Sequence, residues 1–348
     1  MTTGKTQRGE WVSTDPTETA AESDAGLPGQ TLILIHGRSS QPSATHLLKH
    51  WRSALERGLA RDFPDGKGLS KTRVHLVYYG DLLQKLQGDS APNPATELAD
   101  RENALKTLVA LKNSKQFRRV HYEALPGKSS FKEFRADIGA PLSNALGLGS
   151  KRIARVMPEL LEYWQDTDGF RQQVIDRLEE PLNAALERGD RTMVIAHCLG
   201  SVIAYDTFSR ISRGNRAQLL AQPAEKLADK RVDTWVTIGS PLADNYIRHR
   251  LAGGKSHPET TGSVSYPDLL NNWINVAAED DYFCHDETMA NDFADMLDSR
   301  LLSRIDDYRI YNLTQHYGKS NPHGAIGYLI HPRLSLILNN WLTSDPDT

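Results

Sequence analysis

The residue best placed to do chemistry is Cys198, which lies where an apolar run meets a segment of helical spacing. Residues 192–196 form a largely apolar run typical of a buried parallel strand, and helical spacing resumes shortly after Gly200. A tight turn between them would present the thiol at the end of the strand. The helix N-terminus that follows would favour a developing negative charge. A thiol placed in this way suits nucleophilic attack, because an ionised sulfur is a strong nucleophile.

This interpretation depends on the position of Cys198 rather than on its residue type, because free cysteines are commonly small buried apolar side chains. Two other residues are considered as well. Ser201 is the nearest alternative nucleophile, but it falls one turn into the predicted helix and would point elsewhere. Cys284 is the second of only two cysteines. It could approach the same site or pair with Cys198 under oxidation, and we favour an inert, buried role.

Residues 196–200, A-H-C-L-G, resemble the nucleophile elbow G-x-S-x-G of the α/β-hydrolases, with Ala196 in place of the first glycine and Cys198 in place of the serine. The chain is similar to esterase- and lipase-like members that carry a His-Ser-Leu-Gly elbow. Its nucleophile type is similar to that of dienelactone hydrolase, a cysteine member of the same superfamily. The resemblance implies an oxyanion hole formed by the backbone N–H groups of Leu199 and of Arg38, which follows the first apolar run.

The resemblance also implies an acid after a late strand. Asp281 follows the apolar run 273–277, and its surroundings resemble the stretch G-x-x-D-x-x-V of the family. Asp280 is the second candidate. Asp244 is a third, because some relatives carry the acid one strand earlier.

A catalytic histidine should come last in the chain, after the acid. His323 lies in a loop ahead of the apolar residues 327–330, the layout in which esterase- and lipase-like members carry this histidine. His316 is the alternative, and His331 is interpreted as structural because its segment is apolar. The order Cys198, Asp281, His323 matches the nucleophile–acid–base order of the family.

The elements that would position these residues alternate between strand-like and helix-like segments, which predicts a mostly parallel α/β sheet flanked by helices. Strands are expected at residues 31–35, 74–79, 192–196, 232–238, 273–277 and 308–313, and helices at 46–60, 169–188, 202–211 and 334–341. We assign residues 30–80 and 167–345 to an α/β-hydrolase core and residues 1–29 to a disordered tail. Residues 81–166 are too long for one crossover and contain amphipathic stretches at 96–112 and 151–166. They are interpreted as an inserted helical cap.

Composition narrows the partners and the compartment. The formal net charge is −3, and Lys and Arg are spread through the sequence rather than gathered into a run. Both features argue against nucleic acid as a partner. The sequence contains no signal peptide and no run of about 20 apolar residues, so a membrane partner is not expected. Two cysteines fit a reducing compartment, and we expect a cytoplasmic protein. Neither a cofactor motif nor a metal-binding histidine spacing occurs, so no cofactor or metal is expected.

These features predict a cysteine hydrolase that acts on a small activated ester, lactone or thioester through a triad of Cys198, His323 and Asp281 and an acyl-enzyme. One alternative is an acyltransferase using the same acyl-cysteine. A second is a non-catalytic ligand-binding protein of the same fold, and a third is a lipase whose lid is the cap. A fourth is a serine hydrolase carrying an engineered Ser→Cys change. Every part of the site has a candidate residue, which favours an enzyme. The highly charged residues 112–119 argue against a lipid-facing lid.

Overall fold

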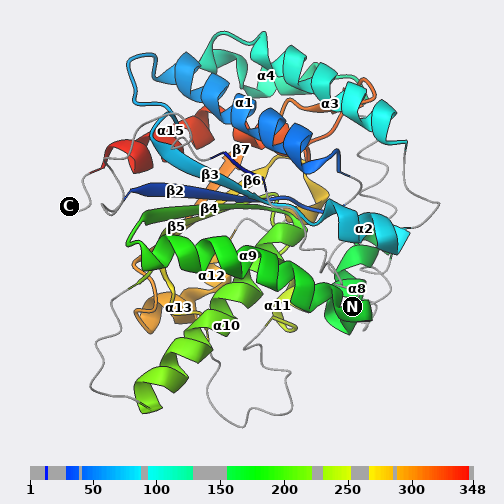
Figure 1. Ribbon diagram of the computed structural model, residues 1–348. Coiled ribbons are helices and arrows are strands. Elements are labelled where there is room, and N and C mark those ends of the chain that lie inside the picture. The colour runs from blue at the N-terminus through cyan, green and yellow to red at the C-terminus, as the bar shows by residue number, and fades with distance from the viewer. Residues whose placement is uncertain are drawn as a thin grey trace, which may run out of the picture.

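The computed structural model describes residues 12–14, 29–38, 41–87, 93–127, 155–221, 230–251, 266–284 and 288–344. Its centre is a seven-stranded sheet in the order β1-β3-β2-β4-β5-β6-β7 (Figure 1). Strands β2 to β7 pair in parallel, and only β1 is antiparallel, against β3. The strands are β1 (Val12–Thr14), β2 (Gln30–Ile35), β3 (Thr72–Val77), β4 (Arg191–His197), β5 (Val232–Ile238), β6 (Leu270–Ala278) and β7 (Arg304–Ile310). The predicted α/β class with a mostly parallel sheet is therefore confirmed.

Helices cover both faces of this sheet (Figure 1). One face carries α1 (Ala44–Asp62), α3 (Pro94–Val109), α4 (Arg119–Glu123), α14 (Ala325–Leu329) and α15 (Pro332–Thr343). The other face carries α8 (Pro158–Gln165), α9 (Phe170–Glu187), α10 (Leu199–Ala221), α11 (Asn245–Arg248), α12 (Met289–Asp292) and α13 (Ala294–Asp298). Helix α2 (Gly80–Gln87) follows β3, and short 3₁₀ turns lie at η3 (Ser114–Gln116), η4 (Thr167–Gly169) and η5 (Tyr282–Cys284). No helix within the described ranges is long and apolar enough to cross a bilayer.

Strand β2 shows why the apolar runs are continuous. Leu32 and Leu34 point into the hydrophobic core on the α1 side, whereas Ile33 and Ile35 point into the core on the α9 side. Side chains of a strand alternate between faces, so a strand covered on both faces needs apolar residues at every position.

Two segments differ from the prediction. The last strand begins at Arg304 and ends at Ile310, earlier than the expected 308–313. Polar residues can belong to this edge strand because they have hydrogen-bond partners there. Asp307, for example, accepts hydrogen bonds from the Asn275 side chain and the Ala290 N–H. Strand β1 lies in the expected tail and pairs with the free edge of β3, with Val12 opposite Leu76. Three residues are too few for a periodic pattern to reveal.

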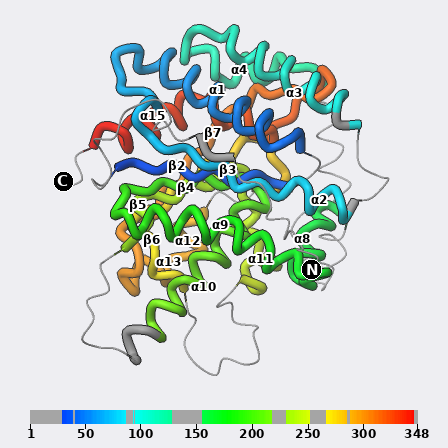
Figure 2. The backbone as a smooth tube through the Cα atoms, in the orientation of Figure 1, coloured from blue at the N-terminus to red at the C-terminus, as the bar shows by residue number. Residues whose placement is uncertain are grey.

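The segment expected to form a cap contributes helices to both sides of the molecule. Helix α3 packs against α1, whereas α8 packs against α9 (Figure 2). A short antiparallel hairpin, β8 (Gln315–His316) and β9 (Lys319–Ser320), contacts α3. Residues 88–92 and 128–154 of the segment lie outside the described residues, and a cap at 81–166 stays a prediction.

The parallel sheet brings the candidate residues together at the edge formed by the carboxyl ends of its strands. Parallel strands end at the same edge, and Gly37, Cys198 and Gly239 follow β2, β4 and β5 there. Asp281 and Asn312 follow β6 and β7 at the same edge. Segments far apart in the sequence are thereby brought to one place.

Candidate active site

Cys198 occupies a sharp turn between β4 and α10. Its backbone φ of 53° lies in the left-handed region, which is strained for a residue with a side chain. The turn depends on two glycines. A Cβ at Gly200 would lie 2.5 Å from the His36 carbonyl oxygen, and a Cβ at Gly37 would lie 2.8 Å from the Cβ of Cys198. The elbow therefore packs directly against the end of β2, and Cys198 itself is 0% exposed.

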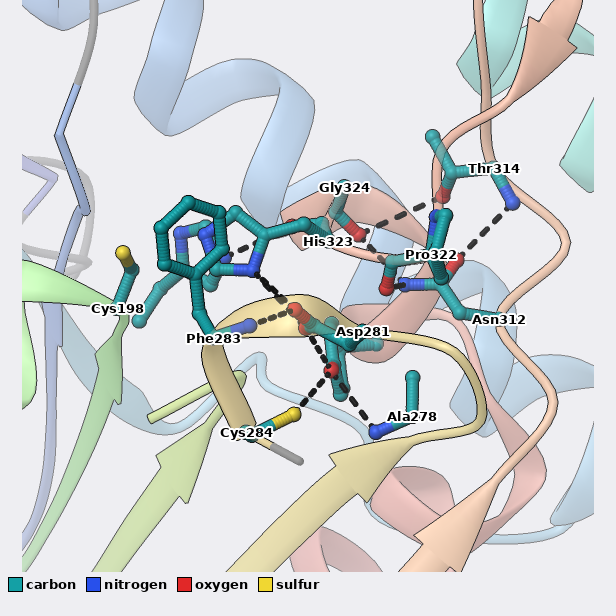
Figure 3. A network of polar contacts seen from close by, with 12 residues as sticks. Cys198, Ala278, Asp281, Phe283, Cys284, Asn312, Thr314, Pro322, His323 and Gly324 are labelled. Atoms are coloured by element: carbon teal, nitrogen blue, oxygen red, sulfur yellow. Dashed lines mark hydrogen bonds and ion pairs between the residues drawn. The ribbon is translucent and has the colours of Figure 1, made fainter. Parts of the chain in front are cut away.

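His323 and Asp281 form a buried ion pair, with His323 Nδ1 2.9 Å from Asp281 Oδ2 and 3.0 Å from Oδ1. Burial opposes charge on the imidazole, but the Asp281 carboxylate and the Cys198 sulfur outweigh it and raise the pKa of His323 to about 10. Burial likewise opposes the carboxylate, yet His323, Tyr328 and the Phe283 N–H together lower the pKa of Asp281 to about 2. Figure 3 shows His323 with Asp281 on one side and Cys198 on the other.

The second ring nitrogen of His323, Nε2, is buried and has no hydrogen-bond partner within the described residues. The Cys198 sulfur is close enough to the His323 ring to raise its pKa. Contacts between a nucleophile and its base are often long before substrate binds.

Asp281 is held by donors other than the histidine. The Tyr328 hydroxyl donates to Asp281 Oδ2 at 2.6 Å and accepts from the Ala278 N–H at 3.0 Å. The Phe283 N–H donates to Asp281 Oδ1 at 3.0 Å. The carboxylate thus has a fixed orientation. Tyr328 could not be predicted from the sequence, because no motif marks it.

The loop that carries His323 is fastened by Asn312, which is fully buried. Its Nδ2 donates to the carbonyl oxygens on either side of the histidine, Pro322 O at 2.8 Å and Gly324 O at 2.9 Å. Its Oδ1 accepts from the Thr314 N–H at 3.0 Å (Figure 3). One side chain therefore fixes the backbone of the loop. Asn312 was also missed, because it fell inside the last strand expected from the sequence, residues 308–313, whereas β7 ends at Ile310.

His197 supports the same loop from the elbow. Its Nε2 lies 3.0 Å from the His323 carbonyl oxygen, so this nitrogen must carry the hydrogen. Burial and the neighbouring His323 hold the pKa of His197 well below its usual value, which keeps the ring neutral. Its ring centroid lies 4.7 Å from that of His323.

The turn after β2 is fixed by His36 and Tyr79. The Tyr79 N–H donates to His36 Nε2 at 3.0 Å, so His36 Nδ1 donates to Gly37 O at 2.8 Å. Burial lowers the pKa of His36 to about 3, consistent with a neutral ring. The Tyr79 hydroxyl donates to His36 O at 2.5 Å. These bonds hold the peptide leading to Arg38 beside the elbow. Leu199 begins α10, so its N–H has no acceptor within the helix.

The other candidate acids have different partners. Asp280 Oδ2 accepts from the Tyr122 hydroxyl at 3.1 Å. Asp244 caps the N-terminus of α11, where it accepts from the N–H groups of Tyr246 and Ile247. Neither is paired with His323.

The other candidate histidines also lie apart from Asp281. His316 Nε2 lies 3.4 Å from Glu97 Oε1, in the β8–β9 hairpin. His331 Nδ1 accepts from the Arg333 N–H at 3.0 Å and so caps α15. Of the three histidines weighed from the sequence, the structure brings only His323 to Asp281.

The alternative nucleophiles are engaged elsewhere. The Ser201 hydroxyl donates to the Cys198 carbonyl oxygen at 2.6 Å and lies 2.7 Å from Ser240 Oγ. Cys284 is buried with its sulfur 3.5 Å from the Tyr328 hydroxyl. Burial and the nearby Asp281 carboxylate raise the pKa of the Cys284 thiol well above its usual value, which disfavours the reactive thiolate.

A cavity of about 710 Å³ adjoins the site, and its walls include His197, Asp281, Phe283 and His323. Cys198 is not among the lining residues. The Phe283 ring lies 4.4 Å from the His323 ring and 4.7 Å from the Arg38 guanidinium. A ligand in the cavity therefore meets His323 directly but reaches the thiol only after side chains move.

No family model matches this chain, and no curated protein shows significant similarity to it. Within the described ranges, no group of three or more His, Cys, Asp or Glu side chains is arranged to hold a metal ion.

Proposed function

We propose that this protein has the α/β-hydrolase fold and is a cysteine hydrolase of activated acyl compounds. Cys198 is the nucleophile, His323 the base and Asp281 the acid of its triad. The observation that carries the proposal is the left-handed backbone at Cys198, φ 53°, which places the thiol at the strand–helix junction beside the buried His323–Asp281 pair. The parallel sheet with one antiparallel edge strand supports the fold assignment.

The raised pKa of His323, about 10, keeps its ring protonated at neutral pH. Cys198 has therefore given its proton to His323 Nε2 before substrate binds, and the reaction begins when the thiolate attacks the acyl carbon. The backbone N–H groups of Arg38 and Leu199 donate to the oxyanion of the tetrahedral intermediate. The intermediate collapses to a thioester on Cys198, and the imidazolium protonates the leaving group. Asp281 keeps Nδ1 protonated, so that Nε2 is the nitrogen that exchanges protons.

The substrate class follows from how readily different leaving groups are expelled compared with the Cys198 thiolate. A tetrahedral intermediate on sulfur expels a thiolate more readily than a simple alkoxide, so ordinary alkyl esters would return to starting material. Thioesters, enol lactones and activated esters have leaving groups that compete with Cys198. Water activated by His323 completes hydrolysis. An alcohol or amine in the same position would give acyl transfer instead.

Trapping the acyl-enzyme tests this proposal. We expect p-nitrophenyl acetate and an acyl thioester each to add one acyl group to Cys198, detected by mass spectrometry of the intact protein and its peptides. Cys198→Ala should abolish acylation, and His323→Gln should slow it by about 10²-fold or more. Cys284→Ala is the matched control and should still be acylated at Cys198. Full turnover in Cys198→Ala would falsify the proposal.

Alkylation gives a second readout that takes burial into account. Because Cys198 is 0% exposed, iodoacetamide should label it slowly in the native protein. Phe283→Ala should accelerate labelling, because the ring lies between His323 and Arg38 at the cavity wall. An unchanged labelling rate would mean that access to the thiol does not pass Phe283.

A further inference from the structure

The place of the cavity relative to the triad indicates which part of a substrate it holds. It is lined by His323, His197 and Asp281 but not by Cys198. In the proposed function, on which this inference rests, His323 delivers its proton to the leaving group while Cys198 keeps the acyl group. The cavity therefore lies on the leaving-group side of the reacting carbon.

The carboxylates in the cavity wall already have donors. Glu97 Oε1 accepts from the Tyr317 hydroxyl at 2.9 Å, and Asp100 Oδ1 accepts from the Tyr317 N–H at 2.8 Å. His316 Nε2 lies within 3.6 Å of both carboxylates, and Asp281 is paired with His323. Arg101 also lines the cavity, and its Nε lies 3.8 Å from Glu97 Oε2, so that carboxylate has a cation beside it as well.

The cations in the wall retain binding capacity. Arg155 and Lys319 line the cavity and have no ion pair with any other residue that the structure describes. The stem of Lys319 is held against the backbone of Gly127, where an added Cβ would lie 3.0 Å from Lys319 Cβ. Nearer the triad, Arg38 pairs with Glu159 only at 3.6 Å, and its buried Nε has no hydrogen-bond partner in the described part of the chain.

We propose that the cavity binds an anionic leaving group, a thiol that carries a carboxylate or phosphate, and that Arg155 and Lys319 select it. The bond between the acyl carbon and the sulfur of the leaving group breaks. The bond between the acyl carbon and Cys198 forms, and the departing thiol takes the proton from His323. The apolar part of the wall, including Phe283 and Tyr282, packs against the body of the leaving group.

Two thioesters that differ only in charge test the proposal. S-(3-carboxyphenyl) thioacetate carries an anion, and S-(3-carbamoylphenyl) thioacetate is its neutral counterpart of the same size. After division by their uncatalysed rates, kcat/KM should favour the anionic thioester by about tenfold at low salt. The preference should shrink as salt rises to about 0.5 M, because partly exposed ion pairs are screened.

Variants identify the groups responsible. Lys319→Ala and Arg155→Ala should each lower the preference, and the double variant should bring it close to one. Lys67→Ala, which removes an exposed lysine from the loop before β3 at the opposite edge of the sheet, is the matched control and should keep the full preference.

The outcomes separate the two proposals. Equal kcat/KM for the two thioesters, or a preference that survives the double variant, overturns the anionic leaving group while the cysteine mechanism stands. Failure of both thioesters to acylate Cys198 overturns the proposed function and this inference together.

Discussion

Tyr328→Phe is the substitution that most directly tests how the acid of the triad is held. It removes one oxygen that donates to Asp281 Oδ2 at 2.6 Å and accepts from the Ala278 N–H at 3.0 Å. A hydrogen bond to a charged acceptor contributes about 1.5–3 kcal/mol, and a buried N–H left unpaired costs about 1–3 kcal/mol. Tyr328 is 0% exposed, so water does not readily replace the hydroxyl. We expect the free energy of unfolding to fall by at least about 2.5 kcal/mol, the sum of the two lower bounds.

The same substitution should change the titration of the acid. The Tyr328 hydroxyl is one of the donors that lower the pKa of Asp281 to about 2, against the opposing effect of burial. Losing it raises the pKa of Asp281. A carboxylate with a depressed pKa stabilises the fold above its unfolded value of 3.8, and this stability disappears as pH falls through the folded value. The variant should therefore lose activity and stability at a higher pH than the native protein does.

Urea unfolding at pH 7 and kcat/KM between pH 3 and 7 measure these two effects. Tyr205→Phe is the matched control, because Tyr205 is equally buried but packs against Trp235 and Phe293 in the core on the α10 side. It should leave the acid limb of the pH profile in place. A Tyr328→Phe protein whose unfolding free energy lies within about 0.5 kcal/mol of the native value, with an unchanged acid limb, would refute the reasoning.

Three further substitutions test neighbouring parts of the site. The pKa of His323 is raised from 6.5 to about 10, so the ion pair stabilises the fold fully below pH 6.5 and less as pH rises toward 10. His323→Gln should flatten the dependence of urea stability on pH between 6.5 and 10, and a slope equal to that of the native protein would contradict the pairing. Asn312→Asp puts a carboxylate against two carbonyl oxygens and should lower kcat and cost about 2 kcal/mol or more of stability; native-like values of both would argue against its role in the loop. Gly239→Ala adds a Cβ at φ 55°, 3.1 Å from Asp281 Oδ2, and should cost activity as well as stability. Gly68→Ala, at φ 57° with nothing within 4 Å, is its control for backbone strain alone, and equal effects on activity would contradict a contact with the acid.

The parts of the fold that the sequence predicts well are those with a local signature. Strand β2 is apolar at its last four positions, residues 32–35, because both of its faces are buried there, and this run is visible in the sequence. The elbow is visible for a similar reason, since a strand, a sharp turn and a helix follow one another within a few residues around Cys198. Resemblance to a family then supplied the acid and the base. The structure places His323 and Asp281 together, but their catalytic roles stay predictions.

The parts that were missed depend on contacts between distant residues. Tyr328 meets Asp281 from 47 positions away, and no pattern near either residue indicates the contact. Asn312 contacts the carbonyl groups of a loop whose path is set by the hairpin before it. The start of β7 was missed for a related reason. Asp307 makes the strand look like a loop until the Asn275 side chain is seen to donate to it.

If Cys198 is the nucleophile, as proposed, its burial bears on the choice between hydrolysis and acyl transfer. A thioester on Cys198 would be attacked from the side of His323, because that residue must take a proton from the attacking group. The cavity of about 710 Å³ adjoins His323, so whatever occupies it after the leaving group departs is in position to attack. Water would give hydrolysis, and an alcohol or amine bound there would give transfer. Under the proposed function, the cations at its wall would attract an anionic acceptor as well as an anionic leaving group. Adding an amine or alcohol that carries a carboxylate to the acyl-enzyme, and measuring the ratio of acylated product to free acid, therefore decides which reaction the site favours.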